Sequence, residues 1–282
     1  MRRSDRVLAV CAGAATFVLA GFVMLPISAI FVRVPPDELL AQLGSPVALD
    51  ALVVSVKTSS IAVLLIVIVG TPVAYVLATQ PFRGSAAVLT LLELPLVLPP
   101  AVAGIGLFAA FGRFGLLGSP LRFLGISIPF TQVAVVMALA FVALPFYVRQ
   151  AVAAFASVDR QLLGASRTLG AGAGGTFVRV GVPLARPGLS AGAALAWARA
   201  LGEFGATIMF AGSLQGRTQT LPLAIYSQFS AGSFESALAM SALLVAVSAG
   251  LLVGVGAVLR SHRAEEVNVH WIPSSASSSA TV

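Results

Sequence analysis

The chain of 282 residues is 58% hydrophobic and only 10% charged, and its mean hydropathy of +1.00 excludes a soluble globular protein. In a soluble protein, the net charge of +7 would suggest a nucleic-acid ligand. In a membrane protein, the same charge is more simply explained by basic cytoplasmic loops, so no nucleic-acid partner is expected. A single cysteine, Cys11, excludes an intrachain disulfide bond.

Several missing residue types restrict the chemistry. Lys57 is the one lysine, and no glycine-rich phosphate loop precedes it, so a Walker-type ATP site is excluded. Both histidines, His262 and His270, follow the last apolar run, which excludes histidine-based metal or triad chemistry inside the membrane. Glu93 and Glu203 lie in apolar runs without a companion metal ligand. We therefore expect no enzyme activity, no cofactor and no metal site.

Six apolar runs are each about as long as a bilayer-crossing helix, which needs about 20 residues. The first run follows a short basic segment and is too long for a cleaved signal peptide, so we expect it to remain as a membrane helix. The sequence therefore predicts an all-α integral membrane protein with six transmembrane helices. The expected spans are residues 7–32, 51–79, 86–111, 131–148, 189–211 and 236–259.

The basic residues predict the orientation of these spans. With both termini in the cytoplasm, inner loops carry far more arginines than outer loops, whereas the reverse orientation violates the positive-inside rule. The arginines assigned to the inside are Arg2, Arg3, Arg6, Arg83, Arg149, Arg160, Arg167, Arg179, Arg186, Arg260 and Arg263, and those assigned to the outside are Arg33, Arg113, Arg122 and Arg217.

Three parts are expected along the chain. Residues 1–50 form an N-terminal transmembrane helix followed by an external loop, and residues 51–260 form one transmembrane domain. Residues 261–282, which are rich in serine, are predicted to be a disordered cytoplasmic tail. The external loops are expected at residues 33–50, 112–130 and 212–235, the last of them dipping partly back into the membrane.

The third expected span contains the sequence ELPLVLPPAVAGIG, in which Pro95, Pro99 and Pro100 prevent a continuous helix. A kink or break is therefore predicted near the middle of the membrane. Such breaks survive only where the freed backbone groups are buried in protein or line a water-filled cavity.

The inner loop at residues 159–188 interrupts the apolar runs with four arginines and one aspartate. A helix is expected at 161–169, because Leu162, Leu163, Ser166 and Leu169 recur at helical spacing. Four glycines are expected to stop this helix before a second short segment at 176–182; they are Gly170, Gly172, Gly174 and Gly175. Small residues on the exposed helix let a partner's backbone approach closely, so the loop is predicted to be a docking surface.

Charged residues also occur deep in the apolar runs. Arg199 and Glu203 are four residues apart and can pair on one helix face, with Arg199 about 15 Å from the helix entrance. The pair either holds helices together or lines a route on which arginine favours an anion. Glu93 is expected to pair with Lys57 or to meet Arg199 or a backbone donor. Lys57 itself is expected to extend towards the membrane surface.

The inner loop resembles the EAA loop of ABC-importer permeases, which reads Glu-Ala-Ala, three residues, Gly, nine residues and Ile-x-Leu-Pro. Ala165, Ser166, Gly170, Val180, Val182 and Pro183 fall on this frame, and Gly164 stands in place of the glutamate. The resemblance implies that the loop seats in a groove of a cytoplasmic ATPase. The implied docking residues are Gly164, Ala165, Ser166, Arg167, Thr168, Leu169 and Gly170.

Three further runs, ELPLVLPPAVAGIGL, ARALGEFGATIMFAG and TQTLPLAIY, resemble molybdate-transport permease subunits, and with the loop they cover residues 49–258. The resemblance implies a type I importer fold in a prokaryotic cell membrane. It also implies a homodimer, two copies of the ATPase, a periplasmic or extracellular binding protein, and alternating access. Glu93, Arg199 and Glu203 are then candidate residues of the translocation path for molybdate or tungstate.

Other functions remain open at this stage. The GEFGAT and FAG runs are shared in part with sulfate and thiosulfate permeases. A channel or secondary carrier that works without a partner ATPase is a different class with the same composition. The frame of the inner loop argues against that class, because such a protein needs no docking loop.

Overall fold

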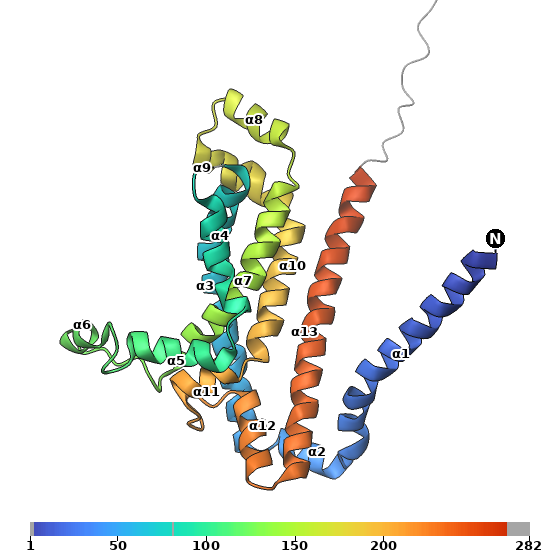
Figure 1. The fold of residues 1–282 in the computed structure, drawn as a ribbon, viewed down its shortest axis with the longest axis vertical. Coiled ribbons are helices and arrows are strands. Elements are labelled where there is room, and N and C mark those ends of the chain that lie inside the picture. The colour runs from blue at the N-terminus through green and yellow to red at the C-terminus, as the bar shows by residue number, and fades with distance from the viewer. Residues whose placement is uncertain (1–2, 81, 270–282) are drawn as a thin grey trace, which may run out of the picture. The chain divides into compact units, whose positions relative to one another are not determined.

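The computed structural model describes residues 3–80 and 82–269, and every regular element in these residues is a helix (Figure 1). This confirms the predicted all-α class. The expected disordered tail falls largely outside the described residues. The chain divides into two compact units, Met1–Ser55 with Ser213–Val247, and Val56–Gly212 with Ser248–Val282.

The first unit contains α1 (Arg3–Arg33), α2 (Pro36–Leu43), the start of α3 (Pro46–Thr79), α12 (Leu221–Ser230) and the start of α13 (Phe234–Val269). Its small core is formed by Ala48, Ala51, Leu221, Ala224 and Met240. The Leu221 backbone N–H also donates a hydrogen bond of 2.7 Å to Ser55 Oγ, which ties the first turn of α12 to α3.

The expected external loop at 33–50 is largely helical, because α2 and the first turn of α3 occupy most of it. Pro36 and Pro46 are the first residues of these helices, a position that suits proline because the first turn has no use for its missing N–H. Ser45 reinforces the start of α3 by accepting a hydrogen bond from the Ala48 N–H. Pro36 and Pro46 therefore each begin a helix.

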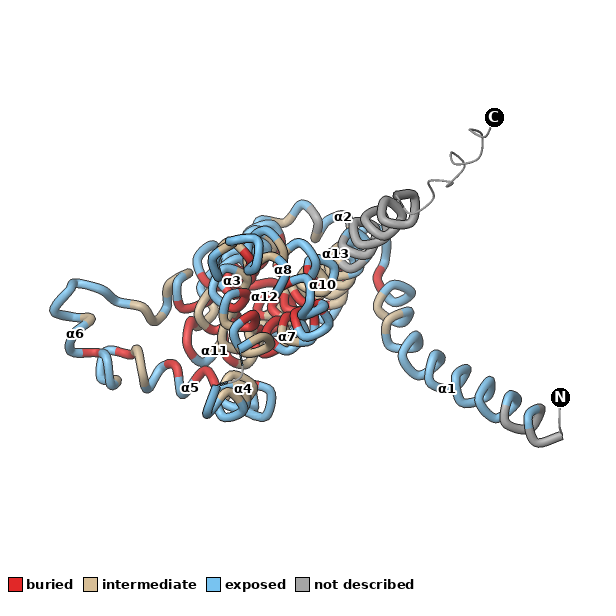
Figure 2. Tube along the Cα trace, turned by 90° about the horizontal axis from the view of Figure 1, so that it is seen from above, coloured by how far each residue is buried: buried red, intermediate tan, exposed pale blue. Residues whose placement is uncertain are grey.

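The second unit is a helical bundle around α7 (Gln132–Ala156), which is buried along much of its length (Figure 2). Alanines on α7 pack against alanines of α10 (Val182–Leu201). Gly188 and Gly192 bring the two helices close together: a Cβ added at Gly188 would lie 2.5 Å from the Cβ of Ala154. Close contact through small residues is the usual way in which helices associate inside a membrane.

The remaining helices of this unit are short and carry the interruptions. They are α4 (Ser85–Glu93), η1 (Leu94–Leu96), α5 (Pro100–Phe111), α6 (Gly118–Phe123), α8 (Arg160–Thr168), α9 (Ala173–Thr176), η2 (Phe177–Gly181) and α11 (Gly205–Ala211). α6 lies within the loop that the sequence analysis places at 112–130, and α12 within that at 212–235.

Among the described residues, four helices are long and apolar enough to cross a membrane, within α1, α3, α7 and α13. A fifth candidate is the bent pair Ser85–Leu96 and Pro100–Phe111, whose halves meet at 110°. This confirms the break predicted in the third span. The fifth predicted span, 189–211, is not one helix: α10 ends at Leu201 and α11 begins at Gly205.

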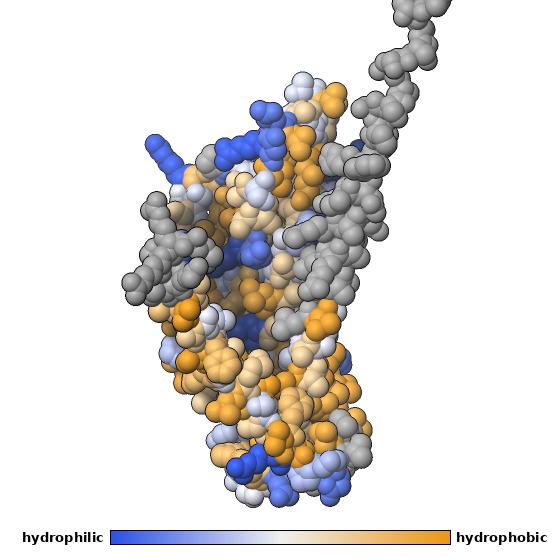
Figure 3. Space-filling view, turned by 90° about the vertical axis from the view of Figure 1, so that its right-hand side faces the viewer, coloured by the Kyte–Doolittle hydropathy of each residue, from blue (hydrophilic) through white to orange (hydrophobic). Residues whose placement is uncertain are grey.

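The outer surface of the helices is largely apolar, as a lipid-facing surface must be. Large aliphatic side chains on α3, such as Leu64, Ile68 and Val69, are exposed. Figure 3 shows hydrophobic residues over much of one face, with hydrophilic ones at its upper end, where α8 lies, as well as in its middle and at its lower end.

Candidate functional site: the 159–188 loop and the charges of the spans

α8 is the exposed helix of the inner loop, and its two ends are closed by local hydrogen bonds. Asp159 caps the start, since its carboxylate accepts a 2.8 Å hydrogen bond from the Gln161 backbone N–H. The side chain of Leu163 is buried and anchors the helix to the bundle. The helix is therefore held firmly although most of its residues face outwards.

Gly170 closes the other end of α8 with a Schellman motif. Its φ of +89° is a left-handed conformation that favours glycine. The Gly170 N–H donates to the Arg167 carbonyl, and the Ala171 N–H donates to the Ser166 carbonyl. The predicted stop at Gly170 is confirmed, and the position demands glycine for backbone reasons as well as for any docking role.

The seven residues predicted to dock a partner lie together on this capped helix and its end. Six of them are exposed, while Ser166 is half-buried. The Ser166 hydroxyl shares a 3.2 Å hydrogen bond with the hydroxyl of buried Thr176, which fastens α8 to α9. The exposed residues are Gly164, Ala165, Arg167, Thr168, Leu169 and Gly170.

The second half of the loop differs from the prediction. Gly174 and Gly175 do not stop a helix, because they lie inside α9. Helical structure then continues through the π-helical turn η2 into α10 without a break from Ala173 to Leu201. Pro183, which has no N–H to donate, lies just after this π-helical turn, where the regular hydrogen-bond pattern is already interrupted. The loop is thus connected to the deep end of α10 by one continuous helical path.

Three aromatic rings lie at the base of this path, and the sequence analysis missed them. Tyr75 on α3 contacts Phe155 on α7 and Phe177 on η2, with ring centroids 5.3 Å and 4.9 Å away. Gly181 allows this packing, because a Cβ there would lie 3.1 Å from the Tyr75 ring. No local pattern connects residues so far apart in sequence. We call Tyr75, Phe155 and Phe177 the aromatic joint.

The predicted pair of Arg199 and Glu203 is confirmed. Arg199 Nη2 lies 2.6 Å from Glu203 Oε2, and the side-chain exposures are 26% for arginine and 1% for glutamate. The setting differs from the prediction, because α10 ends at Leu201 and Glu203 lies in the break that follows. The other carboxylate oxygen, Oε1, accepts a 2.8 Å hydrogen bond from the Ala206 N–H in the first turn of α11.

Glu203 therefore stabilises the break in two ways. It neutralises a charge that costs at least about 2.5–3.5 kcal/mol to hold in a membrane. It also satisfies a backbone donor at a helix start, where negative charge is favoured. The Glu203 carboxylate thus stabilises the break between α10 and α11, and the break supplies the backbone N–H that binds the carboxylate.

The two interrupted segments of the unit meet at this point. α11 packs against α5 with backbones in contact. A Cβ added at Gly104 would lie 2.6 Å from the Ala206 carbonyl oxygen, and one at Gly205 would lie 2.9 Å from the Pro100 Cβ. Interrupted helices that meet in this way are typical of the substrate regions of membrane transporters.

Glu93 was predicted to contact Arg199 or a backbone donor, and this prediction is wrong, because Glu93 pairs with Arg149 instead. Its Oε1 lies 3.0 Å from Arg149 Nε, with side-chain exposures of 28% and 63%. Glu93 is the last residue of α4, immediately before η1, and both of these elements pack against α7. The alternative partner, Lys57, instead donates a 2.9 Å hydrogen bond to Gln132 Oε1 at the start of α7. Of the three candidate path residues, only Arg199 and Glu203 are brought together.

Comparison with known proteins agrees with this architecture. Residues 66–263 match the family described as "Binding-protein-dependent transport system inner membrane component". The chain is 47% identical over 238 residues to the molybdenum transport system permease protein ModB of Mycobacterium tuberculosis, covering 84% of this chain and 89% of the relative. It is 40% identical over 207 residues to ModB of Escherichia coli K12, covering 70% and 90%.

Solved structures share the fold at low sequence identity. One is a bacterial ABC transporter involved in the import of the acidic polysaccharide alginate, with a TM-score of 0.74, 14% identity, and coverage of 92% of this chain and 96% of the other. Another is the MetNI methionine ABC transporter in an inward-facing conformation, with a TM-score of 0.60, 20% identity, and coverage of 76% and 95%. The fold is therefore that of an ABC-transporter permease. The chain belongs to the family of inner-membrane components of binding-protein-dependent transport systems.

Proposed function

We propose that this chain is the pore-forming permease subunit of an ATP-driven importer of molybdate or tungstate. The observation that carries this proposal is its 47% identity, over 84% of the chain, to a molybdenum transport permease. The chain has no Walker-type ATP site of its own, so ATP hydrolysis belongs to a separate cytoplasmic subunit.

The exposed residues Gly164–Gly170 are the proposed contact with that ATPase. They lie on a short helix whose two ends are capped, so a force applied to the helix moves it as a unit. Ala165 and Gly164 present almost no side chain, which allows a groove in the partner to close around the backbone. Gly164 has nothing within 4 Å of an added Cβ, so the glutamate usual at this position would also fit.

Movement of α8 would reach the centre of the membrane through named contacts. Ser166 and Thr176 fasten α8 to α9, and continuous helical structure leads from Ala173 to Leu201. Arg199 lies near the end of this path, and Glu203 joins it to α11, which packs on α5. Closing the ATPase dimer would draw two such loops together and open the pathway outwards, and hydrolysis would reverse the change.

Arg199 is the proposed anion-facing residue of the pathway. A quarter of its side chain remains exposed although its partner is almost completely buried. A guanidinium group that is partly neutralised can attract a divalent oxyanion without holding it tightly, which suits passage rather than storage. Selection among anions would then depend mainly on the external binding protein.

The proposed assembly is a homodimer with two ATPase subunits and one binding protein in a prokaryotic inner membrane. α7 spans the membrane between the loop at 112–130 and the loop at 159–188, so these loops lie on opposite faces. If the 159–188 loop is cytoplasmic, the 112–130 loop is external. The basic residues of the terminal segments are consistent with both termini in the cytoplasm.

Uptake into proteoliposomes tests the proposed function. The permease, its ATPase and its binding protein are expected to accumulate molybdate or tungstate only when ATP is supplied on the ATPase side. Accumulation of sulfate in preference to molybdate would assign the chain to the sulfate permeases. Anion flux by the permease alone, without the other subunits, would support a channel or carrier and contradict the proposal.

A surface variant tests the docking loop separately. Ala165→Arg adds bulk and charge to an exposed helical position without disturbing α8, because arginine is also a good helix former. It is expected to abolish co-purification of the ATPase, while the matched variant Ala165→Ser retains it. Gly170→Arg is less informative, since the φ of +89° would strain any other residue. Normal ATPase binding by Ala165→Arg would show that the loop docks elsewhere.

A further inference from the structure

The segment between α5 and α7, residues 112–127, presents an unusual set of side chains to its surroundings. Phe114 and Phe123 are each 91% exposed, and Leu116 is 88% exposed. Arg113 and Arg122, on the same short segment, are also exposed. Full exposure of three large apolar side chains beside two arginines is unfavourable in water and suited to an interface between water and lipid.

This segment is rigid rather than a flexible loop. It folds back on the end of α5, where the Leu116 and Leu117 N–H groups donate to the carbonyl oxygens of Ala109 and Ala110, at 3.0 Å and 2.8 Å. The Ile126 N–H then donates to the Leu121 carbonyl across the end of α6 at 2.8 Å. The backbone therefore holds the exposed apolar side chains in place, and they cannot turn inwards to escape water.

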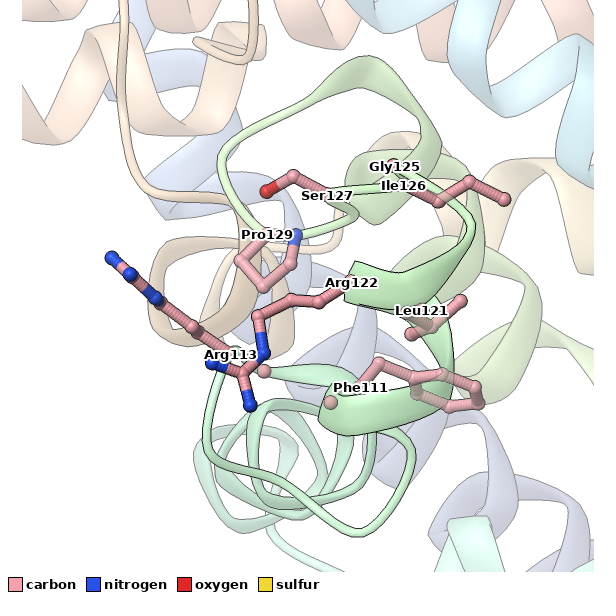
Figure 4. Close-up of a pocket in the computed structure, with 10 residues that line it drawn as sticks. Phe111, Arg113, Leu121, Arg122, Gly125, Ile126, Ser127 and Pro129 are labelled. Atoms are coloured by element: carbon pink, nitrogen blue, oxygen red, sulfur yellow. The ribbon is translucent and has the colours of Figure 1, made fainter.

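A pocket of about 380 Å³ lies within the segment. Apolar side chains form one part of its wall and glycines another, while Arg122 reaches across its mouth towards the base of Arg113, whose own side chain points away from the pocket (Figure 4). The lining residues are Phe111, Gly112, Arg113, Gly118, Leu121, Arg122, Gly125, Ile126, Ser127 and Pro129. The pocket thus combines an apolar patch, formed by Phe111, Leu121, Ile126 and Pro129, with a positively charged rim.

The positive charges of this rim are not neutralised by the protein. Within residues 56–212, Glu93 pairs with Arg149 and Glu203 with Arg199, so neither carboxylate is paired with an arginine of the rim. Residues 56–212 contain one further acid, Asp159, which caps α8 beyond the other end of α7. Residues 56–212 therefore offer no unpaired carboxylate to the rim, which is complementary in charge to an anionic ligand.

We propose that residues 112–127 bind an anionic phospholipid of the leaflet opposite the 159–188 loop. Arg122 holds the lipid phosphate at the mouth of the pocket, Arg113 adds positive charge beside it, and the pocket beside Leu121 and Ile126 accepts the first part of an acyl chain. Phe114, Leu116 and Phe123 lie among neighbouring lipid tails. The segment lies where this requires, since α7 starts five residues after Ser127 and Thr131 caps it. This proposal does not depend on which anion is transported.

Site-directed labelling tests whether the segment contacts lipid. Cys11 is the one cysteine, so Cys11→Ser followed by Phe123→Cys gives a single site for a bimane fluorophore. In vesicles of phosphatidylglycerol with brominated acyl chains, the label in the assembled complex should be quenched by lipid and protected from dissolved iodide. A label at exposed Gln215, introduced by Gln215→Cys, should show the opposite pattern.

Three results would overturn the proposal. Protection from both quenchers would mean that another protein surface, such as a second copy, covers the segment. Quenching by iodide that disappears when the binding protein is added would make the segment a receptor contact. Quenching by iodide both with and without the binding protein would show that the segment is exposed to water. None of these readouts requires transport, so they stand or fall independently of molybdate uptake.

The charged rim is tested with spin-labelled lipids in the same complex. Spin-labelled phosphatidylglycerol should be immobilised in preference to phosphatidylcholine, and removal of each arginine should weaken this preference about fivefold. Arg113→Gln and Arg122→Gln are the test variants, and Arg217→Gln, at an exposed position on another loop, is the control. Equal loss in the control would contradict the proposal. Displacement of the lipid by millimolar phosphate or molybdate would instead assign the rim to a soluble oxyanion.

Discussion

The two ion pairs of the α7 bundle have the same chemistry in different surroundings. Arg199–Glu203 lies at the break between α10 and α11, where the carboxylate is almost completely buried. Arg149–Glu93 lies at the end of α4, where both side chains remain partly exposed. A charge left without its partner is tolerated only where water or flexible neighbours can replace that partner. We call Arg199–Glu203 the deep pair and Arg149–Glu93 the shallow pair. The deep pair should contribute strongly to the stability of the break between α10 and α11, whereas the shallow pair should contribute little to the stability of the segment after α4.

The largest expected effect comes from removing one charge of the deep pair. Glu203→Gln can keep the hydrogen bond to the Ala206 N–H, because an amide oxygen also accepts, but it leaves Arg199 unpaired. Breaking a buried pair in this way costs about 3–5 kcal/mol. The yield and thermal stability of the assembled complex should fall sharply, and both can be measured after detergent extraction.

The double variant Arg199→Gln with Glu203→Gln separates structure from transport. With both charges removed, assembly and thermal stability should recover in large part. If Arg199 attracts the anion, uptake per assembled complex should stay low while ATP hydrolysis continues. Full recovery of molybdate uptake by the double variant would remove Arg199 from the pathway and leave the pair a purely structural role.

The next effect tests whether the deep break is held by close backbone packing as well as by charge. Gly104→Ala places a methyl group 2.6 Å from the Ala206 carbonyl oxygen, so α5 and α11 must separate. Overpacking of this kind costs about 1–3 kcal/mol. Gly106→Ala is a matched control on α5, since nothing lies within 4 Å of its added Cβ. Equal thermal stability of the two variants would show that the contact is not tight.

These features differ in how far the sequence could predict them. Burial of apolar side chains away from water sets the class and most of the spans, so hydropathy alone predicts them. The deep pair follows from a separation of four residues, which local geometry brings together. The break at 202–204 could not be read in the same way, because its stability comes from packing against α5, a segment about a hundred residues away.

The partner of Glu93 also could not be predicted from local sequence patterns. The prolines predicted an interruption, but they did not predict its 110° angle or the packing against α7 that brings Glu93 beside Arg149. Similarly, the sequence analysis expected a loop at 33–50 and did not predict that Pro36 and Pro46 each begin a helix. Local chemistry locates an interruption, whereas the direction of the chain beyond it depends on distant contacts.

A smaller effect is expected at the aromatic joint, which lies at the start of the helical path from the docking loop to Arg199 and Glu203. Phe177→Leu keeps an apolar side chain and removes the ring contact with Tyr75, worth about 1 kcal/mol. The complex should still assemble and hydrolyse ATP, with less molybdate taken up for each ATP consumed. Val178→Leu, at the exposed neighbouring position, should leave this ratio unchanged. The same ratio in both variants would exclude the joint from coupling.

The smallest effect is expected at the shallow pair. Glu93→Gln removes the attraction to Arg149, but the arginine side chain is already 63% exposed and can take other partners. Pairs as exposed as this contribute about 0–1 kcal/mol after screening. The thermal stability of the complex should therefore change little, and much less than in Glu203→Gln, although the two substitutions are chemically identical.

Varying the salt concentration tests the difference between the two ion pairs further. Salt screens exposed charges within about 10 Å at 0.1 M and affects buried pairs much less. The small difference between the parent and Glu93→Gln should therefore vanish as salt is raised, whereas the large difference for Glu203→Gln should persist. If the loss in Glu93→Gln equalled that in Glu203→Gln and resisted salt, the bend would be as strongly charge-dependent as the break. The contrast between the two regions would then be wrong.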